Sequence, residues 1–86
     1  MMETIARVID ALRQPLSDDE RHAGWSQAIK AGYLPVFAKL LDQIERGEKP
    51  PYFGIVRSLD AYGIGGGDLY EMILRAAREV NDRFGN

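Results

Sequence analysis

The spacing of the apolar residues constrains the fold of this chain more than any other feature of its sequence. Along most of the chain, apolar residues recur at intervals of three and four, which is the repeat of an α-helix with one buried face. The clearest run comprises Ile5, Val8, Ile9 and Leu12. Pro15 follows this run and predicts that the first helix ends near Arg13.

Local signals also predict the second and third helices. Ser17 and Glu20 have the spacing of a capping box, in which the serine side chain accepts a backbone N–H and the glutamate reaches back. We expect this second helix to stop at Gly32, because glycine suits a left-handed helix end. A third helix is expected from Pro35 to Gly47, since the N–H that proline lacks would have no partner at a first helical position.

Residues 52–62 fit two kinds of secondary structure. They follow a connector rich in Gly and Pro, residues 47–51, and their apolar residues again have helical spacing. Several of those residues are Tyr, Phe, Ile or Val, which also favour strands, and Gly54 weakens a helix. We therefore expect a fourth helix here, with a strand as the alternative.

The last helix is predicted to run from Leu69 to about Phe84 and to be the longest in the chain. Asp68 and Glu71 repeat the capping logic at its start. Its polar face offers opposite-charge pairs four residues apart, namely Glu71–Arg75, Arg75–Glu79, Arg78–Asp82 and Glu79–Arg83. Five short helices with tight loops predict an all-α single domain over residues 1–86, built as a small antiparallel helical bundle.

The balance of charge and the composition argue against several function classes. Lys and Arg number 11 against 13 Asp and Glu, so the formal net charge is −2. Because phosphate binding draws on an excess of basic residues, we expect no nucleic-acid binding, and we expect no basic membrane-surface helix. The sequence has no cysteine, no apolar run that could span a bilayer and no signal-peptide pattern at its start, so we expect a cytoplasmic protein without membrane contact.

The single histidine and the glycine-rich segment are the two features that could belong to a catalytic, metal-binding or nucleotide-binding site. His22 lies four residues after Asp18, a spacing that could orient an imidazole or supply two metal ligands. Two ligands make a poor metal site, so we expect a partly buried structural histidine. Residues 63–67 lack the pattern of a dinucleotide-binding or Walker loop and are interpreted as a linker before a helix. We predict no catalytic residue, no metal, no cofactor and no small-molecule substrate.

An excess of apolar surface is the feature that points to a function. On a helical wheel, the apolar residues of the last helix cover roughly 200°, whereas a surface helix packed on one core needs about 100°. A partner would cover the excess, or the helix would lie in the centre of the fold with two sides buried. We predict partner contacts at Tyr70 and Leu74 of this helix, and at Phe53 and Tyr33 elsewhere in the chain.

These observations predict a small non-catalytic helical domain that binds another protein or forms a homodimer, with Arg75, Arg78 and Asp82 as a charged rim. One alternative is a mildly acidic inhibitor of the immunity or antitoxin kind, which would cover a basic site on its partner. Another is a DNA-binding regulator with a helix-turn-helix in residues 27–44. Its recognition helix would carry few basic residues, which disfavours this alternative.

Overall fold

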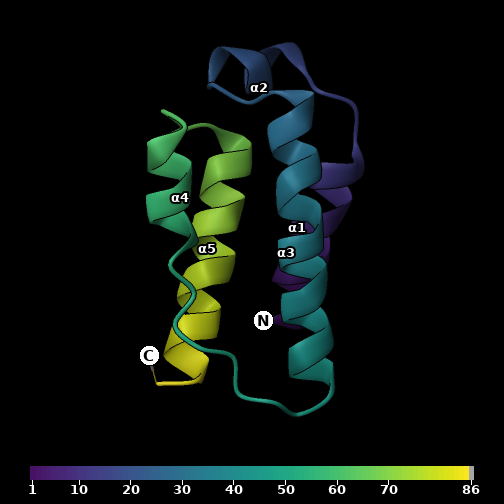
Figure 1. Cartoon of the computed structure of the whole chain (residues 1–86), viewed down its shortest axis with the longest axis vertical. Coiled ribbons are helices and arrows are strands. Elements are labelled where there is room, and N and C mark those ends of the chain that lie inside the picture. The colour runs from purple at the N-terminus through teal and green to yellow at the C-terminus, as the bar shows by residue number, and fades with distance from the viewer. Residues whose placement is uncertain (86) are drawn as a thin grey trace.

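The computed structural model describes residues 1–85, and their regular structure is entirely helical (Figure 1). The elements are α1 (Met2–Arg13), α2 (Asp18–His22), α3 (Gln27–Glu45), α4 (Ile55–Ala61) and α5 (Asp68–Arg83). The predicted all-α class is confirmed, and residues 1–85 form a compact globule of five helices.

Three long helices, α1, α3 and α5, run along the long axis of the molecule, with α1 antiparallel to the other two (Figure 1). α1 packs against both α3 and α5, and α4 packs against α5 in the antiparallel direction. The short α2 lies at the end of the bundle where α3 begins (Figure 1). The arrangement is thus the expected antiparallel bundle, with α1 in contact with two neighbours.

The core is formed by the inward faces of these helices together with a few loop residues. The buried apolar residues are Ile5, Val8, Ile9, Leu12, Trp25, Tyr33, Phe37, Leu40, Ile55, Leu59, Ile64, Leu69, Ile73, Ala76, Ala77 and Val80. The first helix ends at Arg13, as Pro15 predicts, and its predicted apolar run forms its buried face. The helical spacing of apolar residues therefore identified the inward face of α1 correctly.

The second helix ends ten residues earlier than predicted. α2 stops at His22, and Gly24 follows it with φ +104°, a left-handed conformation that glycine adopts without strain. The side chain of Ser26 then accepts the backbone N–H of Ile29 at 3.1 Å and begins α3. A glycine turn followed by a serine cap therefore separates the two helices, a signal that the prediction missed.

α3 runs through the two residues that were expected to interrupt it. The prediction that one helix stops at Gly32 and the next begins at Pro35 is wrong. Pro35 removes one backbone hydrogen bond, to the carbonyl of Ala31, but both residues are exposed, so water can satisfy that carbonyl. Tyr33 and Phe37 are buried on the opposite face, and their packing outweighs the local breaking signals.

The segment that fitted either a helix or a strand contains a helix in its second part. α4 begins at Ile55, and it buries Ile55 and Leu59 against the core. Tyr52 and Phe53 precede it in an irregular segment. Gly63, with φ +78°, follows the helix and donates its N–H to the carbonyl of Asp60.

α5 begins without the predicted cap. Its N-cap is Gly67, which has no side chain to accept a hydrogen bond, and Asp68 is the first helical residue, so the predicted capping role of Asp68 is wrong. Gly67 has φ +101°, and a Cβ there would lie 3.3 Å from the Cβ of Ala23, so the loop before α5 packs against the end of α2. With 16 residues, α5 is also shorter than α3, which has 19 and is the longest helix.

An ion pair with a buried lysine connects α2 to α3. The side chain of Lys30 is fully buried, and its Nζ donates to Glu20 Oε1 at 2.8 Å and to the carbonyl of Gln14 at 2.9 Å. Glu20 also completes the predicted capping box with Ser17, which is confirmed. Burial raises the pKa of Glu20, but the hydrogen bonds from Lys30 and Ser17 and the charge of Lys30 outweigh it, so the pKa lies below its ordinary value.

A second polar contact joins α1 to α5. Thr4 Oγ1 donates to Glu79 Oε1 at 2.7 Å, and the N-terminal ammonium of Met1 lies 3.5 Å from the same oxygen. Arg75 Nε approaches the other carboxylate oxygen of Glu79 at 3.4 Å. The hydrogen bond from Thr4 is the main reason why the pKa of Glu79 lies below its ordinary value.

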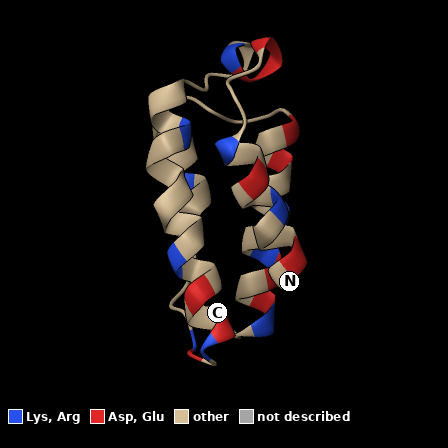
Figure 2. Ribbon diagram, turned by 90° about the vertical axis from the view of Figure 1, so that its right-hand side faces the viewer, with Lys and Arg blue, Asp and Glu red and all other residues tan. Residues whose placement is uncertain are grey.

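Charged residues of both signs are interspersed along the helices (Figure 2). Arg7 pairs with Glu3, Arg21 with Asp18 and Arg46 with Asp42. Among the helices formed by residues 1–85, none combines the length and apolar character needed to cross a bilayer.

Candidate functional site

A groove of about 830 Å³ lies between α4, α5 and the irregular segment that precedes α4. We refer to it as the α4–α5 groove. The irregular segment contributes Tyr52 and Phe53, and α5 contributes Tyr70 and Leu74. Tyr52 is 68% exposed, whereas the other three side chains are half-buried. The groove thus presents aromatic and aliphatic groups that the chain itself covers only in part.

One wall of the groove is fixed by an asparagine of α5. The backbone N–H of Phe53 donates to Asn81 Oδ1 at 2.8 Å, and Asn81 Nδ2 donates to the carbonyl of Phe53 at 3.2 Å. The ring of Phe53 packs edge-on against Phe37, with their centroids 5.3 Å apart. Phe53 is therefore held at its backbone by α5 and at its ring by α3, so contacts within the chain fix the position of this wall.

Three of the four predicted contact residues meet in this groove. Phe53, Tyr70 and Leu74 all line it, although Phe53 lies 17 and 21 positions away from the other two in sequence. The structure establishes this grouping, while their contact with a partner stays a prediction.

The fourth predicted contact residue, Tyr33, lies elsewhere. It was expected at a junction between a loop and a helix, but it lies inside α3 and is only 7% exposed, so that placement is wrong. Its hydroxyl shares a hydrogen bond with Ser58, and its ring packs edge-on against Trp25 and Tyr62. Tyr33 borders a different hollow on the α3 side and takes no part in the α4–α5 groove.

The charged residues of the groove form no salt bridge among the residues that the structure describes. Arg57, Arg78 and Asp60 line it and are exposed, and within residues 1–85 no salt bridge involves any of them. The predicted pair Arg78–Asp82 is therefore not formed. Arg78 instead borders the groove.

Two further predicted pairs on α5 are also absent from the described residues, those of Glu71 with Arg75 and of Glu79 with Arg83. Only Arg75 and Glu79 pair as predicted. Glu79 is occupied by Thr4 and by the N-terminal ammonium, and Arg83 lies over the ring of Phe84, 5.8 Å from its centroid. Helical spacing alone did not predict these competing contacts.

Sequence reasoning missed the role of Asn81 in this site. One signal was present, because Leu74, Arg78 and Asn81 follow the spacing of one helix face. The partner of Asn81 was not predictable, since Phe53 lies 28 residues away and offers backbone groups rather than a side chain. The groove wall is thus a product of the tertiary fold.

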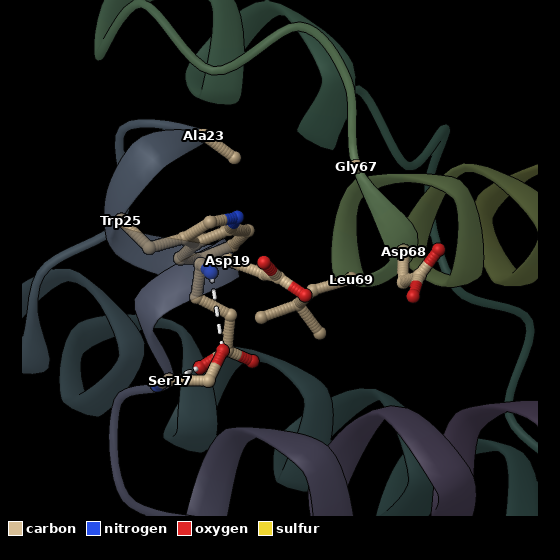
Figure 3. Close-up of a pocket in the computed structure, with 8 residues that line it drawn as sticks. Ser17, Asp19, Ala23, Trp25, Gly67, Asp68 and Leu69 are labelled. Carbon is tan, nitrogen blue, oxygen red and sulfur yellow. Dashed lines mark hydrogen bonds between the residues drawn. The ribbon is translucent and has the colours of Figure 1, made fainter.

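A second hollow, of about 310 Å³, lies between α2 and the start of α5 (Figure 3). Asp19 and Glu20 from α2 and Asp68 from α5 line it, beside the indole of Trp25 and the side chain of Leu69. The dashed lines in Figure 3 mark the hydrogen bonds between Ser17 and Glu20. In the part of the chain that the structure describes, no three His, Asp or Glu side chains converge as metal ligands would.

His22 is exposed at the end of α2, so the expected partly buried structural histidine is wrong. Asp18, four residues before His22 in the same helix, pairs with Arg21 instead, and no ion pair of His22 occurs within residues 1–85.

Comparison of this chain with protein-family models, with curated proteins and with solved structures finds no match in any of the three. The site is accordingly interpreted from its own geometry.

Proposed function

We propose that this chain is a non-catalytic protein-binding domain and that a partner protein docks in the α4–α5 groove. The groove combines aromatic side chains with arginines, which are the residue types enriched at protein interfaces. Its wall is held in place by Asn81, so little ordering would be needed on binding.

A single observation carries this proposal. Three side chains that the sequence predicts as partner contacts, Phe53, Tyr70 and Leu74, border one groove. Their convergence supports a contact surface, because partly exposed aromatic and aliphatic side chains grouped in a groove can anchor a partner.

The charge of the groove favours a different protein over a second copy of this chain. In a symmetric dimer the same surface meets itself, so two grooves that each carry two arginines and one aspartate would bring net positive charge against net positive charge. Like charges brought together in this way oppose association. The alternative role as an acidic inhibitor would require an acidic contact surface, and the arginines of the groove do not favour it.

The proposal is tested by affinity capture from cells that produce this protein, followed by titration of the purified partner. Leu74→Asp replaces an apolar side chain of the groove with a charged one and is expected to weaken binding at least about ten-fold, because an apolar contact is lost and a hydrated carboxylate is placed in the interface. Val36→Asp is the matched control, since Val36 is an exposed apolar residue of α3, 39% accessible, that does not line the groove.

Circular dichroism of both variants checks that the helices remain folded. Tyr70→Ala is a second groove variant for the case in which Leu74→Asp unfolds the chain, and it is also expected to weaken binding. A monodisperse monomer that captures no protein in a manner dependent on Leu74 or Tyr70 would contradict the proposal.

A further inference from the structure

We infer that the occupant of the α4–α5 groove is an acidic amphipathic protein segment, whose apolar side chains enter the groove while its carboxylates bind Arg57 and Arg78. This inference rests on the proposed function and adds the chemistry of the partner.

The unequal pairing of arginines is the first observation that supports it. Arg7, Arg21, Arg46 and Arg75 each form a salt bridge with a nearby carboxylate. Arg57 and Arg78 form none within the described residues, although Asp60 and Asp82 lie three and four positions along their helices. Arg13 and Arg83 also lack a salt bridge there, but neither lines the groove, so the groove is where two such arginines lie beside an apolar surface. The two guanidinium groups at the groove are thus available to an incoming acceptor.

The local charge is the second observation. The chain as a whole has a formal charge of −2, yet Arg57 and Arg78 outnumber Asp60 in the groove. The groove is therefore a locally positive surface on an acidic chain. Complementary charge increases the rate of encounter and favours acidic partners over basic ones.

The apolar side chains of the groove indicate that the partner segment also carries apolar side chains, between its carboxylates. Phe53, Tyr70 and Leu74 supply an apolar surface beside the arginines, and burying it requires apolar side chains on the partner. A groove between two helices accommodates an amphipathic helix, which presents apolar side chains every three or four residues with charged residues beside them. Arginine binds carboxylates with two parallel hydrogen bonds, so this pairing also sets the register of the segment.

The inference is tested by selecting displayed random peptides of about 16 residues, roughly four helical turns, on the immobilised wild-type chain. We expect the selected peptides to alternate apolar residues with Asp or Glu, and their binding to weaken as salt is added. The double variant Arg57→Gln/Arg78→Gln is expected to bind them about ten-fold more weakly.

Arg7→Gln/Arg13→Gln is the matched control, because it removes the same charge from two exposed arginines of α1 that do not line the groove. Its affinity for the selected peptides is expected to equal that of the wild type. Equal losses in both double variants would overturn the inference, because they would reflect net charge rather than the groove.

Two results separate the inference from the proposed function. Peptides that lose binding to Leu74→Asp or Tyr70→Ala but carry no acidic residues would overturn the acidic segment and leave the groove as a binding site. A selection that yields no peptide sensitive to either substitution would contradict the groove itself, and the inference with it.

Discussion

Two regions of this small bundle treat their charged residues in opposite ways. Where α2 meets α3, Lys30 is fully buried and bound by Glu20 and by the carbonyl of Gln14. At the α4–α5 groove, Arg57 and Arg78 are exposed and have no carboxylate partner in the described chain. The first set of charges thus contributes to the packing of the fold, whereas the second does not, and it is the second set that we propose binds a partner.

Lys30→Met is expected to lower the free energy of unfolding by the largest amount. The substitution fills a similar volume but leaves the carboxylate of Glu20 without its cation in a largely buried place, which costs about 3 kcal/mol of unfolding free energy. Urea unfolding followed by circular dichroism measures the change. Lys39→Met is the control, because Lys39 is an exposed lysine of the same helix, and it is expected to change stability by less than about 0.5 kcal/mol. Equal losses in the two variants would contradict a structural role for the buried pair.

Low pH is expected to weaken two contacts, that of Glu20 with Lys30 and that of Glu79 with Thr4. Glu20 and Glu79 both have a pKa below the ordinary value of 4.5 in the folded chain. A carboxyl of this kind stabilises the fold above its unfolded pKa, and the stabilisation is lost as the pH falls through the folded pKa. The melting temperature should therefore decrease as the pH falls below about 4.5.

The double variant Glu20→Gln/Glu79→Gln tests this assignment. Glutamine keeps a side-chain oxygen that accepts hydrogen bonds but does not titrate, so the variant should be less stable at neutral pH and lose less stability in acid. The melting temperature of both proteins as a function of pH provides the measurement. A variant curve parallel to that of the wild type would assign the acid sensitivity to other groups.

Arg57→Gln/Arg78→Gln gives the smallest expected effect on stability. Because neither arginine has an ion pair within residues 1–85, their removal should change the unfolding free energy by no more than about 0.5 kcal/mol. The same urea titration measures it, beside Lys30→Met. A loss above about 1 kcal/mol would mean that the groove arginines support the fold, and the contrast between the two regions would fail.

Much of the fold was predictable because it depends on local patterns. The spacing of Ile5, Val8, Ile9 and Leu12 predicts the buried face of α1, and Ser17 with Glu20 predicts the start of α2. The predictions that failed concern features that depend on contacts between residues far apart in the sequence. Pro35 and Gly32 signal an interruption locally, but the packing of Tyr33 and Phe37 holds one helix through them.

The candidate site was predictable to a similar extent. The apolar arc of α5 identified Tyr70 and Leu74, which do border the groove. Lys30 gave no signal of its burial, because its partners Gln14 and Glu20 lie 16 and 10 residues away. Tyr33 was misplaced for the same kind of reason, since the extent of α3 decides that it faces the core.

Chemical-shift mapping of the ¹⁵N-labelled chain, titrated with a selected acidic peptide, tests the central claim most directly. We expect the largest changes at the backbone amides of Phe53, Leu74 and Arg78, which border the groove, and no change at Lys30, whose charge is already bound. Large changes around Lys30 or Val36, with Phe53 and Leu74 unaffected, would contradict the assignment of the α4–α5 groove as the docking site.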